Sequence, residues 1–225
     1  MTADRAGFAP ESIRANLARI HDRIAQAGGD PDRISVLGVT KGFGPDAAVA
    51  AVAAGLPSLG ESYAQELADK APAVASAGET PEWHFIGRLQ SNKVRLIDDA
   101  VSCWQSVDRP SLVAEIAKRV PGARILVQVN AAGEPQKGGC EPDRVEDLVG
   151  AAREAGLAVE GLMTIGVDGD DRATRRAFEV VAGMADALAL DVRSMGMSAD
   201  LELAVEAGTT MVRVGSGLFG PRPRP

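Results

Sequence analysis

A lysine follows the first apolar, β-branched run of the chain. Residues 34–40 form this run, Lys41 comes directly after it, and Gly42 and Gly44 let the backbone turn closely around the lysine. A lysine amine that is partly removed from water has a lowered pKa and can react with a carbonyl group. A solvated lysine that simply ends a strand explains the same position, so this residue alone leaves both interpretations open.

A glycine-rich turn near the end of the chain is a second candidate site. Gly215, Gly217 and Gly220 match the pattern G-x-G-x-x-G after an apolar run, but only five residues follow. A dinucleotide site needs a long helix and further strands there, so that interpretation fails. Backbone N–H groups of Gly215 and Ser216 would instead bind a phosphate. The alternative is a plain glycine-rich chain end.

A serine in the preceding loop fits the same phosphate site. Ser198 follows the apolar run 192–195 and precedes a predicted helix. Its hydroxyl and the helix N-terminus would act together with Gly215 and Ser216, because barrels commonly bind phosphate with the loops after strands seven and eight. The structural alternative is a helix N-cap at Ser198.

An arginine and a histidine lie inside apolar runs. Arg213 belongs to the run 209–214 and His84 to the run 83–86. A buried guanidinium keeps its proton and needs an acceptor, such as a ring nitrogen or a carboxylate. An ion pair in the protein interior is the structural alternative for Arg213. His84 would be either a general base or a core residue with satisfied hydrogen bonds.

Alternating strands and helices position these residues. The expected strands cover residues 34–40, 57–60, 83–86, 102–106, 124–130, 158–163, 192–195 and 209–214. The expected helices between them cover residues 46–55, 63–77, 91–98, 109–119, 142–155, 171–189 and 199–207. Repeated strand–helix units without hairpins indicate a parallel sheet, and eight of them without a linker favour a closed barrel over an open sheet.

The predicted fold is therefore a single α/β domain over residues 1–225, a (β/α)8 TIM barrel. It carries an extra N-terminal helix at 10–27 and a loose tail at 221–225. Active and binding sites of such barrels lie at the carboxyl ends of the strands. The lysine, the phosphate-site residues and the arginine are therefore expected to meet at one mouth of the barrel.

The composition limits the class of protein. The 225 residues are 45% hydrophobic and 24% charged, which is ordinary for a globular chain. A net charge of −7 and an aromatic content of 4% argue against nucleic-acid or anionic-membrane partners. A signal-peptide core and a membrane-spanning run are absent from the sequence, so a cytoplasmic protein is expected. Its two cysteines and two histidines have no metal-ligand spacing, and no metal is expected.

Six motifs occur in unbroken order along most of the chain. They are V-T-K ending at 41, G-E-S-Y at 60–63, W-H-F-I-G-R-L-Q-S-N-K at 83–93, G-L-M-T-I at 161–165, S-M-G-M-S-A-D at 194–200 and M-V-R-V-G-S-G-L-F-G at 211–220. Together they closely resemble the pyridoxal phosphate homeostasis protein family. The chain departs from the family at Ser62, where Asn is usual, and at Ser216, where Thr is frequent.

The resemblance implies a fold like the barrel domain of alanine racemase and a bound cofactor, pyridoxal 5′-phosphate (PLP). It also implies a role for each candidate residue. Lys41 would hold PLP as a Schiff base, and Arg213 would face the pyridine nitrogen. The phosphate would be bound by Ser198, Gly215 and Ser216.

The resemblance further implies a carrier without catalytic residues rather than an enzyme. Members of the family serve intracellular vitamin B6 homeostasis by storing and delivering PLP, with PLP-dependent apo-enzymes as recipients. We expect a monomer. A single-domain, PLP-dependent amino-acid racemase of low activity is the alternative, although it needs bases on both faces of the substrate carbon and the only tyrosine is Tyr63. A third hypothesis is a phosphosugar-binding barrel enzyme that uses Lys41 as its Schiff-base lysine.

Overall fold

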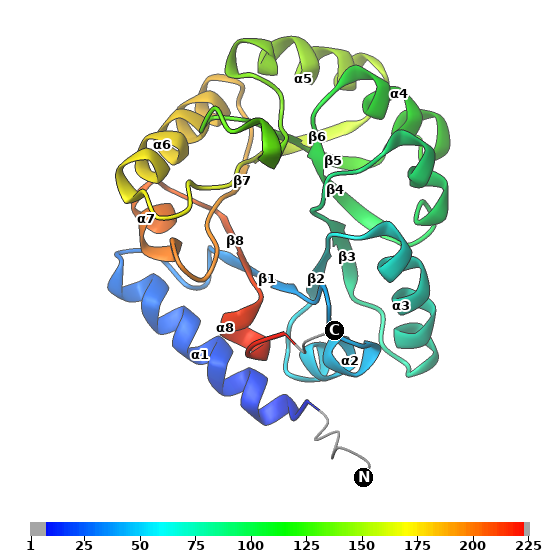
Figure 1. Cartoon of the computed structure of the whole chain (residues 1–225), viewed down its shortest axis with the longest axis vertical. Coiled ribbons are helices and arrows are strands. Elements are labelled where there is room, and N and C mark those ends of the chain that lie inside the picture. The colour runs from blue at the N-terminus through cyan, green and yellow to red at the C-terminus, as the bar shows by residue number, and fades with distance from the viewer. Residues whose placement is uncertain (1–7, 223–225) are drawn as a thin grey trace.

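The chain folds into a closed barrel of eight parallel strands (Figure 1). The computed structural model describes residues 8–222. The strands are β1 (Ser35–Val39), β2 (Ser58–Glu61), β3 (Glu82–Phe85), β4 (Val101–Val107), β5 (Arg124–Gln128), β6 (Ala158–Met163), β7 (Val192–Ser194) and β8 (Met211–Val214). Each strand pairs with the next one in the sequence, and β8 closes the barrel on β1. The predicted (β/α)8 barrel is confirmed.

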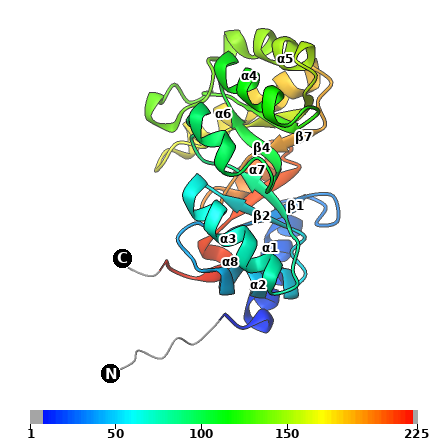
Figure 2. The same cartoon turned by 90° about the vertical axis from the view of Figure 1, so that its right-hand side faces the viewer.

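Helices cover the outside of the barrel. They are α1 (Pro10–Gln26), α2 (Pro45–Ala53), α3 (Ala64–Ser76), α4 (Pro110–Arg119), α5 (Val145–Glu154), α6 (Asp171–Ala187), α7 (Leu201–Glu206) and α8 (Ser216–Phe219). Short 3-10 helices are η1 (Ser91–Leu96), η2 (Pro135–Lys137) and η3 (Pro142–Arg144). Viewed from the side, α1, α2, α3 and α8 lie around one half of the barrel, and α4, α5 and α6 around the other (Figure 2).

Two predicted elements differ from the structure. The segment predicted as a helix over 91–98 is the tighter 3-10 helix η1, where the N–H of Lys93 bonds to the carbonyl of Gln90 at 2.9 Å. A short, tight helix suits this place because only residues 97–100 separate it from β4. The glycine-rich segment predicted as a turn after the last strand continues instead as the one-turn helix α8.

The strand register shows which side chains point into the barrel. Leu37 of β1 pairs with Arg213 of β8, so the two side chains share one face of the sheet. The Arg213 guanidinium reaches the carbonyl of Thr164, which follows β6, two strands away. This face is therefore the barrel interior, and strand alternation directs Val39 toward the same side. Lys41 follows two residues later, beyond the end of β1, and lies near enough to Arg213 for the charge of Arg213 to lower its pKa.

The predicted extra N-terminal helix is confirmed as α1. Its apolar stripe, with Ile13, Ile20 and Ile24 buried, packs against α2, α7 and α8. The amide of Asn16 donates a hydrogen bond to the carbonyl of Leu218 in α8 at 2.9 Å. Through such contacts α1 supports the segments that follow the last two strands.

The single domain over residues 1–225 stays a prediction. Residues 1–7 and 223–225 lie outside the described part, and with them most of the predicted loose tail at 221–225. Within residues 8–222, each helix is too short or too polar to cross a lipid bilayer.

Candidate functional site

The Lys41 amine lies at the mouth of the barrel with a lowered pKa. The residue is half-buried just beyond the carboxyl end of β1. Burial lowers the pKa of the amine most, and the positive charges of Arg222 and Arg213 lower it further, whereas the Glu61 carboxylate opposes the shift. The amine donates no hydrogen bond to any residue within 8–222. It is therefore available to react.

A buried ion pair lies behind the lysine, between the sheet and α3. Lys70 of α3 is 3% exposed and Glu61 at the end of β2 is fully buried, and the two side chains pair directly. The Thr40 hydroxyl donates to Glu61 Oε1 at 2.7 Å. Burial raises the pKa of Glu61, and the Lys70 ammonium acts against that shift. Glu61 Oε2 is buried and has no hydrogen-bond partner within the described chain.

This cluster holds the peptide groups on both sides of Lys41. Lys70 Nζ donates to the Thr40 carbonyl at 2.8 Å and to Glu66 Oε1 at 2.9 Å. Glu66 Oε1 in turn accepts the backbone N–H of Gly42 at 2.7 Å. Because both neighbouring residues are fixed to α3, the Lys41 side chain leaves from a rigid backbone.

Arg213 is a buried cation without a carboxylate partner among residues 8–222. Its Nη1 donates to the Ser194 carbonyl at 2.6 Å and to the Ser194 hydroxyl at 2.8 Å, and its Nη2 donates to the Thr164 carbonyl at 2.7 Å. Burial lowers its pKa to about 10, and the Asp200 carboxylate acts in the other direction. The interior ion pair that was the structural alternative is therefore not formed by the described residues, since the partners of Arg213 are neutral oxygens.

The three residues predicted to bind phosphate lie at one corner of the mouth. The Ser198 hydroxyl accepts the N–H of Gly217 at 3.3 Å, which joins the loop after β7 to the turn after β8. A Cβ atom on Gly217 would lie 2.9 Å from Val214 Cγ1 and 3.1 Å from Ser198 Oγ, so this corner is tightly packed. Ser198 is not the N-cap of the next helix, because Asp200 takes that position. Ser216 opens α8 and is exposed.

His84 lies far from this corner, at the amino-terminal end of the barrel. It is 2% exposed and lines a cavity of about 430 Å³ with residues from the beginnings of β1, β2, β3, β5 and β8. Burial lowers its pKa most, followed by the charge of Arg124. As a core residue at the opposite end, it cannot act as a general base at the mouth.

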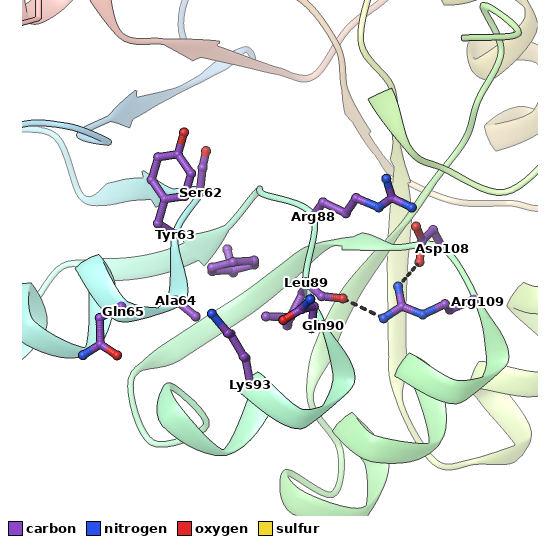
Figure 3. A pocket seen from close by; sticks show the side chains of 11 residues that line it. Ser62, Tyr63, Ala64, Gln65, Arg88, Leu89, Gln90, Lys93, Asp108 and Arg109 are labelled. Carbon is purple, nitrogen blue, oxygen red and sulfur yellow. Dashed lines mark hydrogen bonds and ion pairs between the residues drawn. The ribbon is translucent and has the colours of Figure 1, made fainter. Parts of the chain in front are cut away.

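A larger cavity adjoins the mouth, at the carboxyl ends of β2, β3 and β4 (Figure 3). It has a volume of about 720 Å³ and is lined by Arg88, Lys93 and Arg109, among others. Arg109 is held by Asp108 at 2.7 Å and by the Leu89 carbonyl at 2.7 Å. The cavity includes none of the five residues predicted to bind the cofactor.

Three further residues near Lys41 have no clear functional signal in the sequence pattern around them. Glu61 lies in the motif at 60–63, but only its burial reveals its part in the site. Lys70 falls on the buried stripe of α3 together with Leu67 and Val74, and a lysine on an apolar stripe was a usable signal of a buried ion pair. Arg222 lies in the segment predicted as a loose tail, where the sequence offered no signal.

The comparisons with known proteins agree with this architecture. Residues 9–223 match the family model of the alanine racemase N-terminal domain. The chain is 36% identical to the pyridoxal phosphate homeostasis protein of Escherichia coli, over 93% of this chain and 97% of that protein. It is 37% identical to the protein of the same name from Pseudomonas aeruginosa, over 94% and 95% of the two chains.

Solved structures give the same result. The structure of PipY from Synechococcus elongatus with PLP bound aligns with a TM-score of 0.76 at 28% identity, covering 89% of this chain and all of that one. Alanine racemase of Corynebacterium glutamicum aligns with a TM-score of 0.71 at 16% identity, and the match spans 62% of that enzyme. The fold is thus that of the racemase barrel domain, and the chain belongs to the pyridoxal phosphate homeostasis protein family.

Proposed function

We propose that this protein binds PLP through Lys41 and serves as a carrier of the cofactor in vitamin B6 homeostasis. The observation that carries the proposal is the arrangement of Lys41 and Arg213. The Lys41 amine extends from a rigid backbone at the barrel mouth and has a lowered pKa. The charge of the buried Arg213 guanidinium, which has no carboxylate partner among residues 8–222, contributes to that shift. The names of the relatives and the PLP-bound PipY structure support the same ligand.

The residues at the mouth fit the cofactor. A guanidinium has five N–H groups, and three of those of Arg213 are used by neutral oxygens. The remaining N–H groups have no acceptor within residues 8–222, so a ring nitrogen placed there would complete the arginine's hydrogen bonding. When bound, PLP supplies an aldehyde that condenses with a primary amine and releases water.

Each side chain then has a separate task. Lys41 presents an amine with a pKa below the ordinary lysine value, because burial and two positive charges disfavour its ammonium form. Arg213 would donate a hydrogen bond to the pyridine nitrogen. The Ser198 hydroxyl and the backbone N–H groups of Gly215 and Ser216 would donate hydrogen bonds to the phosphate at the tight corner between the loops after β7 and β8.

A carrier is favoured over a racemase by the chemistry of Arg213. A guanidinium that donates to the pyridine nitrogen keeps this nitrogen unprotonated, which weakens the ring as an electron sink. A racemase also needs bases on both sides of the substrate carbon, whereas the one tyrosine, Tyr63, is 61% exposed. We further propose that PLP-dependent apo-enzymes receive the cofactor and that the protein delivers it as a cytoplasmic monomer.

The direct test is the visible absorption of the purified protein with PLP, before and after borohydride, followed by peptide mapping. We expect a yellow protein that is bleached by reduction and carries a phosphopyridoxyl group on Lys41. Lys41→Ala should lose the adduct, while Lys118→Ala, a change at an exposed lysine of α4, should keep it. A protein that stays colourless and unmodified with added PLP would overturn the proposal.

The racemase alternative has its own test. The PLP-loaded protein is incubated with L-alanine and L-serine, and the enantiomers are resolved by chiral chromatography. Absence of the D-amino acids is the expected result for a carrier. Formation of D-product that disappears in Lys41→Ala would assign an enzyme instead.

A further inference from the structure

A chain of hydrogen bonds crosses the barrel interior from the cofactor arginine toward the opposite end. Arg213 Nη1 donates to Ser194 Oγ at 2.8 Å, and the Ser194 hydroxyl donates to Gln105 Oε1 at 2.7 Å. Gln105 Nε2 contacts His84 Nδ1 at 2.6 Å. The four residues come from β8, β7, β4 and β3, and each is at most 4% exposed. This series of hydrogen bonds therefore links the two ends of the barrel, and none of its four residues is accessible to solvent beyond 4%.

The direction of each hydrogen bond follows from its neighbours. Arg213 can only donate, so Ser194 Oγ accepts from it. The amide oxygen of Gln105 faces the same hydroxyl, which therefore donates its proton to Gln105 Oε1. This leaves the Gln105 amide nitrogen as donor to His84 Nδ1, with Met211 Sδ 3.2 Å away as a second weak acceptor. His84 Nδ1 must then be an acceptor. With the Gln105 amide in this orientation, His84 is neutral and carries its proton on Nε2, which is buried and has no hydrogen-bond partner within the described residues.

We propose that Gln105 is a positioning residue that holds Arg213 through Ser194, and that neutral His84 fixes the orientation of the Gln105 amide. The inference rests on the proposed function, because the arginine orients the pyridine ring only if PLP binds at the mouth. His84, Gln105 and Ser194 would thus affect cofactor binding although they contact neither Lys41 nor the phosphate corner.

Protonation of His84 would reverse this arrangement. An N–H on Nδ1 would meet the N–H of Gln105, so the amide must rotate and present its oxygen to the histidine. The amide nitrogen would then face Ser194 Oγ. The Ser194 hydroxyl would no longer have Gln105 Oε1 as the acceptor for its proton, although its oxygen would still accept from Arg213. The arginine's anchor would therefore weaken when the histidine becomes charged.

The charged groups around His84 determine how readily it takes up a proton. Glu82 Oε2 of the same strand lies 3.7 Å from His84 Nε2 and favours the charged form. Arg124 of β5 opposes the charged form, and Glu160 of β6 favours it. Cys103 on β4 is the register partner of His84, and burial raises the pKa of its thiol to about 12, so it stays neutral. Across the amino-terminal cavity stand His21 and Asp32.

Burial is the largest influence on His84 and lowers its pKa. The neutral form, which the hydrogen-bond directions require, is therefore favoured at neutral pH. PLP binding and His84 protonation should oppose each other, and by linkage this opposition is reciprocal.

The tautomer can be measured directly, without any cofactor. The chain has two histidines, so a protein labelled with 15N-histidine gives two imidazole signals in long-range 1H–15N NMR, and His21→Gln assigns them. We expect His84 to be protonated at Nε2 and unprotonated at Nδ1. A proton on Nδ1 at neutral pH would overturn the inference, whatever the result for PLP binding.

Two variants test the link to the cofactor. Gln105→Leu interrupts the series of hydrogen bonds between Ser194 and His84. Ser194→Ala removes only a hydroxyl, so it still tests the link if Gln105→Leu does not fold. Each should raise the Kd for PLP about tenfold, the scale of one lost hydrogen bond, and should shift the visible band of the bound cofactor. Borohydride should still attach the cofactor to Lys41 in both. Wild-type Kd and spectrum in both variants would refute the positioning role.

The linkage gives a final readout. The NMR titration of His84 is repeated with PLP bound, and we expect its pKa to fall relative to the ligand-free protein. Gln105→Leu should abolish that difference. An unchanged His84 titration in a wild-type protein that carries PLP on Lys41 would show that the histidine is uncoupled from the site, while the proposed function would stand.

Discussion

At the scale of single residues, the reactivity of Lys41 is determined by its surroundings rather than by its position alone. A lysine after a strand is ordinary, and most such residues are solvated. Here burial and the charges of Arg222 and Arg213 all disfavour the ammonium form. An amine attacks an aldehyde only when it is unprotonated. The lowered pKa therefore increases the reactive fraction of Lys41 at any given pH below the ordinary lysine pKa.

The first prediction is therefore a pH profile for Lys41. The rate at which pyridoxal, an aldehyde without a phosphate, is trapped on Lys41 by cyanoborohydride should rise with pH and level off below 10.5, the ordinary lysine pKa. Arg222→Gln removes one positive charge and should move the midpoint upward, toward that value. The measurement is mass spectrometry of the Lys41 peptide across pH. A midpoint that Arg222→Gln leaves in place would show that this arginine does not act on the amine.

At the scale of elements, the contact between β2 and α3 joins stability to function. Lys70 lies inside the protein and has three acceptors: the Thr40 carbonyl and the carboxylates of Glu61 and Glu66. Such a buried pair contributes little net stability compared with an apolar pair, but removal of one partner is costly because the other charge stays buried. The same bonds hold the backbone that carries Lys41.

The second prediction follows for Lys70→Met. The free energy of unfolding should fall by about 3–5 kcal/mol at pH 7, because Glu61 would be left ionised and unpaired. The loss should shrink as the pH falls and Glu61 becomes protonated, since without Lys70 the pKa of the buried carboxyl rises further. Urea unfolding at several pH values measures both effects. The double variant Lys70→Met/Glu61→Gln should regain part of the stability; if it regains none, the unpaired charge is not the cause.

The third prediction concerns the corner between the loops after β7 and β8. Gly217→Ala places a Cβ 2.9 Å from Val214 Cγ1 and 3.1 Å from Ser198 Oγ, so the turn must shift away from Ser198. The Kd for PLP should rise at least several-fold, while pyridoxal should be trapped on Lys41 as in the wild type. Gly183→Ala in α6 is the matched control, because its Cβ meets no atom within 4 Å. It should leave the affinity unchanged and add about 1 kcal/mol of stability.

The elements themselves were largely predictable, whereas the interior contacts were not. Apolar runs such as 34–40 predict buried parallel strands because both faces of such a strand are covered. Lys41 and Arg213 could be nominated because each stands in, or next to, such a run. The contact between Gln105 and His84 depends on the stagger of β3 against β4, where the register shifts between Trp83 and His84. A local pattern carries no information about that stagger.

At the scale of the whole molecule, the proposed site lies across the seam where the barrel closes. Lys41 follows β1, whereas Arg213 lies in β8 and Ser216 follows it, and β1 and β8 are the first and last strands. The seam is held by backbone bonds such as that from the Ser35 N–H to the Thr210 carbonyl, at 2.9 Å. A ligand that contacts both strands therefore acts as an additional link between the two ends of the sheet.

The last prediction is that PLP protects this seam more than the rest of the barrel. A ligand at 100 times its Kd stabilises the form that binds it by about 2.7 kcal/mol, which slows any opening that releases the ligand by roughly 100-fold. Hydrogen exchange read by mass spectrometry should therefore slow most in peptides that cover β1 and β8, and less in β4 and β5 across the barrel. Lys41→Ala should lose most of this protection. Equal protection of all strands would mean that the barrel opens only as a whole, and that its two terminal strands do not separate first.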